Sequence, residues 1–512
     1  MKKVQHIAIF LIFFSLVSQR FSVFAQKNIL ELLPGSEKLI YDENKKTQRL
    51  IGNVRFIYQG NKMFCDSATY YEKEGIVNAY GNVHINKDDT LNLFCDSIHY
   101  FSKIKKAKLW GHVRIRDREY KITTDSLEYD ANKGQAVYRH GGKIENILKK
   151  EILLSKVGYI YPDSKNFIFS GNVRYNTPNI KMTTDTLKYQ YLQKKVYFYG
   201  PTKITTEDNV ITCSKGWYHT ESEESLLQKN VQVLQESTII KGDSLYYHPK
   251  KGLAIGRGNI FYADTTEKIS FQSQYFYKND AKKINFITDK ALCSYLLEKD
   301  TLFIHADSIF VFSDSLKKVT SAQAYHHARF FKSNLQGRCD SISFLKDKGF
   351  MEMFYDPIVW SQNAELKGVK MNAHLKDSVL DKIEILENSS VVMEVDSSLY
   401  NQVYGKEMFC YFLQNELHKV EVFGNSQTIY FPEEKTDKDS IFEIKRSGMN
   451  RIYSGDIKVY LDSGEVKKVV YLTQADAVFY PFNLINKEEQ FIKNFSWNPL
   501  LRPKRKEELF NR

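Results

Sequence analysis

A two-part motif recurs along this chain, and its recurrence constrains the fold more than any other feature of the sequence. The first part is Gly-Asn followed by an apolar residue, and the second is Asp-Ser or Asp-Thr within an alternating apolar run. Copies of the Asp lie 30, 29, 60 and 58 residues apart, which gives a period of 29 to 30 with degenerate copies near Ser155 and Ser214. Such a period indicates an array in which each repeat packs against its neighbours. The motif residues are Gly52, Asn53, Asp66, Gly81, Asn82, Asp96, Asp125, Gly171, Asn172, Asp185 and Asp243.

Each period contains two strand-like runs of roughly a dozen residues separated by turn signals. The runs VRFIY at 54–58 and VRIR at 113–116 alternate apolar and polar side chains, as a strand with one wet face does. Segments rich in Gly, Asn, Asp and Lys stand between the runs and are typical of hairpin turns. With 14% aromatic residues as well, the sequence predicts an all-β fold of antiparallel strands.

The Gly-Asn and Asp-Ser elements interrupt the strands at regular places. Gly within a strand usually marks a bulge or a bend, and Asn tolerates the unusual dihedrals that a bend requires. An Asp-Ser pair on the partner strand can accept hydrogen bonds from backbone amides that the bend leaves unpaired. If the bends stack in register, the sheet folds along a crease into two facing sheets.

The apolar side chains would then line the space between the two facing sheets. Sheets that pack directly lie about 10 Å apart and fill this space, whereas sheets splayed into a V leave a long apolar groove. Both arrangements, an open lipid groove and the closed core of an ordinary sandwich, fit the alternation. The candidate groove residues are Val54, Phe56, Val83, Ile85, Val113, Ile115 and Val173.

The N-terminus indicates export. Lys2 and Lys3 precede an apolar run at 7–17, and a small residue, Ala25, ends the segment. This is the layout of a secretory signal peptide, predicted at residues 1–25, with an uncleaved membrane anchor as the alternative.

The net charge and the cysteine content limit which partners and which cross-links the chain could have. The formal net charge of +12 favours anionic partners. For an exported protein a phosphorylated lipid or an anionic cell-surface polymer fits better than nucleic acid. The six cysteines are too few and dispersed for a disulfide scaffold, and none forms a C-x-x-C motif. Cys65 and Cys95 occupy equivalent places, so they predict either a disulfide or two buried thiols on one face.

Catalysis and metal binding are not indicated. An Asp that recurs once per two strands is unlike a singular catalytic carboxylate and unlike the dense ligand sets of calcium loops. His326 and His327 are adjacent, and adjacent residues on a strand point to opposite faces, which argues against joint metal ligation. The chain has no phosphate-binding loop, dinucleotide fingerprint or nucleophile elbow. We therefore expect a protein that is not an enzyme and has no cofactor.

Taken together, the Gly-Asn-Val runs and the segments CDSATYY at 65–71 and TDSLEY at 124–129 resemble the OstA-like family. That family comprises periplasmic bridge proteins of lipopolysaccharide transport and the N-terminal domain of the outer-membrane lipopolysaccharide assembly protein. The resemblance is clear over 50–260, and the segment at 400–432 resembles the Bacteroidetes-type version. It implies OstA-like repeats at 26–300 and degenerate OstA-like or LptC-like repeats with a C-terminal tail at 301–512.

The resemblance implies an elongated antiparallel β-jellyroll, or β-taco, with an open apolar groove that shields lipid acyl chains. It implies a periplasmic protein associated with the outer membrane and no catalysis. Its partners would be the lipid A acyl chains of lipopolysaccharide and bridge proteins of both membranes, joined by strand addition, with head-to-tail self-association also possible. Sugar and phosphate would project from the open side, near Lys62, Arg114 and Arg116. The alternative is a structural or adhesive cell-surface β-array without lipid, and a carbohydrate-active β-solenoid is a third hypothesis.

Overall fold

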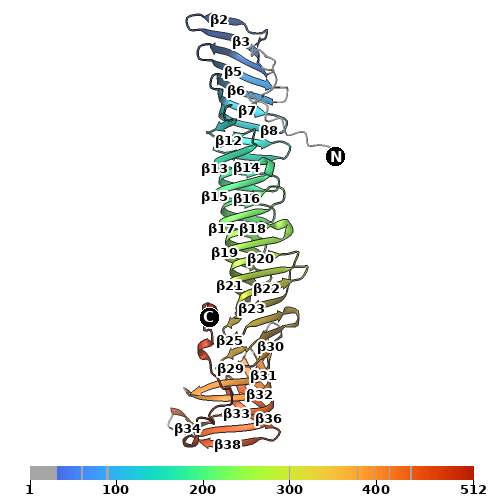
Figure 1. Ribbon diagram of the computed structural model, residues 1–512, viewed down its shortest axis with the longest axis vertical. Helices are drawn as coiled ribbons and strands as arrows, with labels where there is room; N and C mark the ends of the chain where they lie inside the picture. Colours follow the sequence, from blue (N-terminus) through green and yellow to red (C-terminus); the bar gives the residue numbers. More distant parts are fainter. Residues whose placement is uncertain are drawn as a thin grey trace. The chain divides into compact units, whose positions relative to one another are not determined.

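The computed structural model describes residues 31–58, 61–87, 91–298, 300–376, 379–396, 398–413, 416–438 and 441–511 (Figure 1). These residues form antiparallel strands and short 3-10 helices, so the predicted all-β class is confirmed. The signal peptide predicted at 1–25 lies outside the described residues. In the part of the chain that the structure describes, no helix is both long and apolar enough to cross a membrane.

The chain divides into two compact units. Unit 1 runs to Glu236 and includes Ser244–Lys250, and unit 2 comprises Ser237–Asp243 and the chain from Lys251 onward. The division passes through β18 (Thr238–His248) and the 3-10 helix η2 (Pro249–Lys251). The domain boundary expected between residues 300 and 301 lies inside unit 2, at the start of β22, and stays a prediction.

In unit 1 each strand pairs antiparallel with the next along the chain, except where half-length strands replace full ones. The two ends of β8 pair with β9 and β10, and β12 and β11 then pair with the two ends of β13. The elements are β1 (Glu31–Leu32), β2 (Lys38–Asp42), β3 (Thr47–Tyr58), β4 (Asn61–Tyr71), β5 (Ile76–Lys87), β6 (Leu91–Phe101), β7 (Lys106–Arg116), β8 (Tyr120–Asp130), β9 (Gln135–Tyr138), β10 (Gly142–Asn146), β11 (Glu151–Ser155), β12 (Val157–Tyr161), β13 (Asn166–Asn176), β14 (Lys181–Gln190), η1 (Tyr191–Gln193), β15 (Lys195–Thr205), β16 (Asn209–His219) and β17 (Ser225–Gln235).

A bulge divides each full strand into two halves. In β3, Ile51 pairs with Ser67 and Val54 pairs with Cys65, so Gly52 and Asn53 together face one residue of β4. Their φ angles of 79° and 45° are left-handed, a region open to Gly and tolerated by Asn. We call the sheet containing 47–51 and the segments paired with it the first half-sheet, and the sheet containing 54–58 the second half-sheet.

The inner faces of the two half-sheets form the core of unit 1. In β7, Ala107 and Leu109 are buried on the first half-sheet, and Val113 and Ile115 are buried on the second. The intervening side chains of β7 are mostly exposed, because successive residues of a strand point to opposite faces.

In the regular motif copies, the Asp contacts the bulge of the following strand. The Asp66 carboxylate accepts a hydrogen bond from the Asn82 side chain at 3.0 Å, and Asp96 lies 2.9 Å from His112 Nδ1. We expected these carboxylates to bond freed backbone amides, and the side-chain partners correct that expectation. A Cβ added to Gly81 would lie 2.2 Å from Asp66 Oδ2, so the position has no room for a side chain.

Other motif copies vary this contact. Asp185 covers Gly200, because a Cβ added to Gly200 would lie 2.6 Å from the Asp185 Cβ. In unit 2, the Asp243 carboxylate accepts a hydrogen bond from the Asn259 side-chain amide at 2.8 Å. At Gly171 the covering residue is Lys156 instead of an Asp.

The Asp125 copy differs most, because it falls where β9 and β10 replace a full strand. The bulge residue there is Gly141, with a φ of 96°, and an added Cβ would meet no atom within 4 Å.

His326 and His327 also occupy a bend. Their φ angles are 62° and 54°, and they lie against Asp340 and Asp307 at 3.5 and 3.0 Å. The premise that they alternate along a regular strand was therefore wrong. They lie at a bulge-like break between β23 and β24, and each faces its own carboxylate.

Unit 2 contains the same kind of ladder, with a long run of half-length strands in its middle. Its strands are β19 (Leu253–Asp264), β20 (Ile269–Asn279), β21 (Ile284–Leu296), β22 (Thr301–Ser313), β23 (Val319–Tyr325), β24 (Arg329–Lys332), β25 (Leu335–Arg338), β26 (Ser341–Leu345), β27 (Phe350–Phe354), β28 (Ile358–Ser361), β29 (Ala364–Lys367), β30 (Lys370–Lys376), β31 (Val379–Asp396), β32 (Leu399–Leu413), β33 (Glu416–Tyr430), β34 (Glu433–Lys438), β35 (Ile441–Arg446), β36 (Gly448–Asp462), β37 (Glu465–Leu472) and β38 (Asp476–Pro481). Its 3-10 helices are η3 (Lys346–Lys348), η4 (Phe482–Leu484), η5 (Pro499–Leu501) and η6 (Lys506–Phe510).

After β38 the chain turns back over unit 2 (red in Figure 1). We call residues 482–510 the C-terminal strap. Glu365, which is fully buried, accepts hydrogen bonds from Trp360 Nε1 at 2.8 Å and from the Asn498 amide at 3.0 Å. Farther along the strap, Arg502 donates to Gln336 at 2.7 Å. The strap thus covers one outer face of β25, β28 and β29.

Candidate functional site

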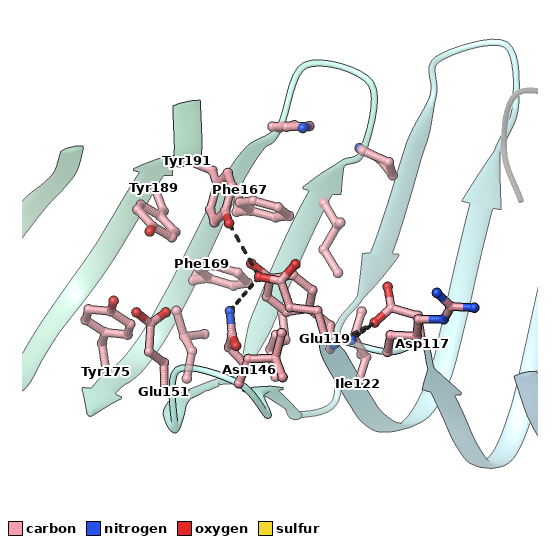
Figure 2. A pocket seen from close by; sticks show the side chains of 18 residues that line it. Asp117, Glu119, Ile122, Asn146, Glu151, Phe167, Phe169, Tyr175, Tyr189 and Tyr191 are labelled. Atoms are coloured by element: carbon pink, nitrogen blue, oxygen red, sulfur yellow. Dashed lines mark hydrogen bonds between the residues drawn. The ribbon is translucent and has the colours of Figure 1, made fainter. Parts of the chain in front are cut away.

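The candidate site is a pocket of about 300 Å³ in unit 1, between the two half-sheets (Figure 2). Its rim consists of the turns at the strand ends farthest from the bulges. The turns that follow β7 and β10 belong to the second half-sheet, and those that follow β12 and β14 belong to the first. The pocket therefore opens at the edge of the fold opposite the crease.

The interior of the pocket is apolar. Its lining from the second half-sheet includes Ile122, Ile144 and Leu153, and its lining from the first includes Phe167 and Phe169. These side chains alternate with outward-pointing ones along their strands, which is why both half-sheets present apolar atoms to the same space. Such a lining suits a ligand with hydrocarbon surface.

Aromatic rings form one wall of the pocket. The ring of Tyr189 lies 6.3 Å from the rings of both Phe167 and Tyr175, and 5.9 Å from the ring of Tyr191. Tyr191 belongs to η1, whose short turn places its ring at the rim. Figure 2 shows these rings projecting from neighbouring strands toward the same space.

A polar cluster borders the opening. Glu119 accepts a hydrogen bond from the Asn146 side-chain amide at 3.0 Å, and the Tyr191 hydroxyl donates to it at 3.4 Å (Figure 2). This cluster joins the turns of the two half-sheets across the mouth of the pocket. Asp117 accepts from the backbone amides of Glu119 and Tyr120, which fixes the turn that carries Glu119.

Burial shifts the titration of the pocket carboxyls. It raises the pKa of Asp117, although the two backbone amides oppose the shift. Burial also raises the pKa of Glu151, which Figure 2 shows beside Tyr175. A raised carboxyl pKa means that the apolar surroundings disfavour the charged form. In the described part of the chain no group of three or more His, Cys, Asp or Glu side chains could hold a metal ion.

The predicted groove residues lie in the same interior layer but do not line this pocket. All seven are buried on the inner face of the second half-sheet, with exposed fractions between 1% and 7%. Whether they contact lipid stays a prediction. They are Val54, Phe56, Val83, Ile85, Val113, Ile115 and Val173.

The pocket residues themselves were not predicted. The signal available in the sequence was the aromatic segment NFIFSGNVRY at 166–175, which supplies Phe167, Phe169 and Tyr175. Nothing in the sequence indicated the rim cluster of Glu119, Asn146 and Tyr191, because these residues come from a turn, the end of β10 and η1, which are far apart in the repeat pattern.

Cys65 and Cys95 are free thiols, buried on the inner face of the second half-sheet. Of the two alternatives, the structure therefore has buried thiols and no disulfide between them. Burial, aided by the neighbouring Asp66, raises the pKa of Cys65 to about 12.

None of the curated proteins compared with the chain matches it. Among solved structures, the chain is similar to LptH from Pseudomonas aeruginosa, described as the LptA-homologous periplasmic component of the conserved lipopolysaccharide transport device. The identity is 11% and the TM-score 0.22, covering 29% of this chain and 95% of that one.

A family model described as OstA-like protein matches residues 29–185 and 179–243. These residues contain every copy of the motif from Gly52 to Asp243. The Bacteroidetes-type resemblance at 400–432 lies outside the matched residues and stays a prediction. Over residues 29–243, the chain is therefore similar to the OstA-like protein family.

Proposed function

We propose that this protein carries lipopolysaccharide across the periplasm by shielding its acyl chains between the two half-sheets. The observation that carries the proposal is the apolar pocket, which opens at the edge opposite the crease and lies within the OstA-like residues. Each CH₂ group that moves from water into such an interior contributes about 0.8 kcal/mol. A few methylenes held in this way lower the cost of crossing water without any catalytic step.

The polar rim suits an amphipathic ligand. Acyl chains would enter between Ile122 and Phe167, while the head group stays outside, near Glu119 and Tyr191. Burial disfavours the charged form of Glu151. Placing a hydrocarbon chain beside this carboxyl therefore costs less free energy when the carboxyl is protonated.

Bridging to other transport proteins would use the unpaired side of the first strands. Among the described residues, β1 and β2 pair only with β3, and Leu39, Ile40 and Tyr41 on β2 are exposed. An exposed apolar edge is normally an aggregation liability, whereas here it could accept a strand from a partner in the inner or outer membrane, or from a second copy.

Site-specific photocrosslinking tests lipid shielding. Benzoylphenylalanine would replace Phe167 or Ile115 inside the fold, and Tyr80, exposed on the outer face of β5 in the first half-sheet, would serve as the control. We expect lipopolysaccharide adducts in intact cells from the interior positions and none from the control. The near-complete burial of residues such as Ile115 favours a second candidate function, a structural β-array with a filled interior. Adducts to protein alone at both interior positions would establish that alternative and contradict lipid shielding.

A further inference from the structure

The outer face of the second half-sheet in unit 1 carries a row of cations at one register. Arg55, Arg114, Lys143, Arg174 and Lys203 are joined by direct cross-strand pairing. Phe64, His84 and Phe94 separate Arg55 from Arg114, and one residue separates each later pair of neighbours. We call these five residues the cationic row. Strands lie about 4.8 Å apart, so neighbouring cations from Arg114 to Lys203 are about 10 Å apart.

The acids on this face are fewer than the cations. Glu145 pairs with Lys121 and Lys143. The other carboxylates lie two residues along their strands from the row, toward the crease, and belong to Asp66, Asp96, Asp125 and Asp185. The next row adds further cations at Lys62, Arg116 and Lys181. The outer face of the first half-sheet is more balanced, because Glu128 there approaches both Lys108 and Arg139.

The row crosses a hollow of about 1100 Å³. The hollow lies where half-length strands interrupt the crease, and Arg114, Lys143, Lys156 and Arg174 line it with His140. A concave surface of this kind admits a chain-like ligand. Its four Lys and Arg side chains outnumber its one carboxylate, Asp125, and a cleft with such an excess of positive charge concentrates anions.

Neighbours of the cations favour a glycan. Thr123 separates Arg114 from Lys143, and Thr183 separates Arg174 from Lys203. Alternating cations and hydroxyls match a polymer that alternates acidic groups with hydroxyls. At the other end of the row the rings of Phe64, His84 and Phe94 stack on one another, so their faces are not open to nucleobases.

We propose that the cationic row and its hollow bind a linear anionic polysaccharide along the outer face of the second half-sheet. This site is separate from the interior pocket and does not depend on lipid shielding. A glycan bound here would tether the protein to an acidic cell-surface polymer while the interior stays free for lipid.

Binding of fluorescent polygalacturonate oligomers to the full chain, followed by anisotropy, tests the proposal. The test variant combines Arg114→Gln, Arg174→Gln and Lys203→Gln. The matched control, Arg49→Gln with Lys108→Gln and Lys188→Gln, removes the same charge from one row of the first half-sheet.

We expect the test variant to bind roughly tenfold more weakly, with a shallower salt dependence, and the control to bind almost normally. All six positions are on outer faces, and circular dichroism would verify that both variants fold. Equal weakening in the two variants would mean attraction by net charge alone and would overturn the proposal. Binding of polyglutamate, single-stranded DNA or anionic vesicles as tight as that of polygalacturonate would overturn it too, as would the absence of binding.

Discussion

The Gly81→Ala substitution tests the crease directly. Gly81 has a φ of 75°, and an added Cβ would lie 2.2 Å from Asp66 Oδ2. An L side chain in the left-handed region costs about 1 to 2 kcal/mol. Asp66 would also have to leave its hydrogen bond with Asn82, which contributes about 0.5 to 1.5 kcal/mol. We therefore expect the local free energy of unfolding to fall by about 1.5 to 3.5 kcal/mol.

Gly141→Ala is the matched control for this prediction. Gly141 also has a left-handed φ, 96°, but an added Cβ there meets no atom within 4 Å. The control therefore carries the backbone cost without the collision, and we expect it to cost about 1 to 2 kcal/mol. The difference between the two variants measures what the Asp66 carboxylate contributes by covering the bulge.

Hydrogen exchange read by mass spectrometry suits this comparison better than a single melting temperature. In a stack of repeats each element contacts only its neighbours, so unfolding need not be one cooperative step. A loss of about 1.5 to 3.5 kcal/mol should speed exchange in peptides from β4 and β5 roughly ten- to three-hundredfold. Exchange in β4 and β5 of Gly81→Ala that rises no more than exchange in β9 and β10 of Gly141→Ala would refute the steric argument.

Three further predictions concern buried groups. Glu365→Ala leaves the Asn498 amide without its acceptor, which should cost about 1 to 3 kcal/mol of stability. Hydrogen exchange should then be faster throughout the C-terminal strap, and unchanged exchange there would contradict the conclusion that Glu365 holds the strap in place. Burial, with a smaller effect of Arg329, lowers the pKa of His305 beside η6, so stability should fall as the pH drops below the ordinary His value near about 6.5. Proteolysis of η6 across that range measures the effect, and a His305→Phe variant should lose the pH dependence. The Cys65 thiol, with a pKa of about 12, should resist iodoacetamide at pH 8 until urea unfolds the chain, and rapid labelling of the folded protein would contradict its burial.

The crease could be predicted from the sequence because its causes are local. The preference of Gly81 for a left-handed φ and the tolerance of Asn82 are properties of single residues, and their fixed spacing sets the register. What could not be predicted was the partner of Asp66. Choosing the Asn82 side chain over a backbone amide depends on the exact offset between two strands, which periodicity does not give.

The contacts of the C-terminal strap could not be predicted from the sequence, for a different reason. Glu365 and Asn498 are separated by 133 residues, and neither belongs to a repeat copy that a period could align. The buried Glu365 carboxylate is surrounded by the Trp360 indole, the Lys367 ammonium and the backbone and side-chain amides of Asn498, and the last two reach it only because the strap brings Asn498 to β29. The pairing of Arg502 with Gln336 is equally remote, at a separation of 166 residues.

The irregular repeat around β10 and β11 links the two candidate sites. On these strands Ile144 and Leu153 face the interior pocket, while their immediate neighbours Lys143 and Leu154 line the outer hollow. Successive residues of a strand point to opposite faces, so one local break in the crease opens both surfaces. The regular copies hold the half-sheets closed, as the burial of Val113 indicates. Departures from a consistent pattern are where function is expected, and here the least regular repeat is the one to mutate first.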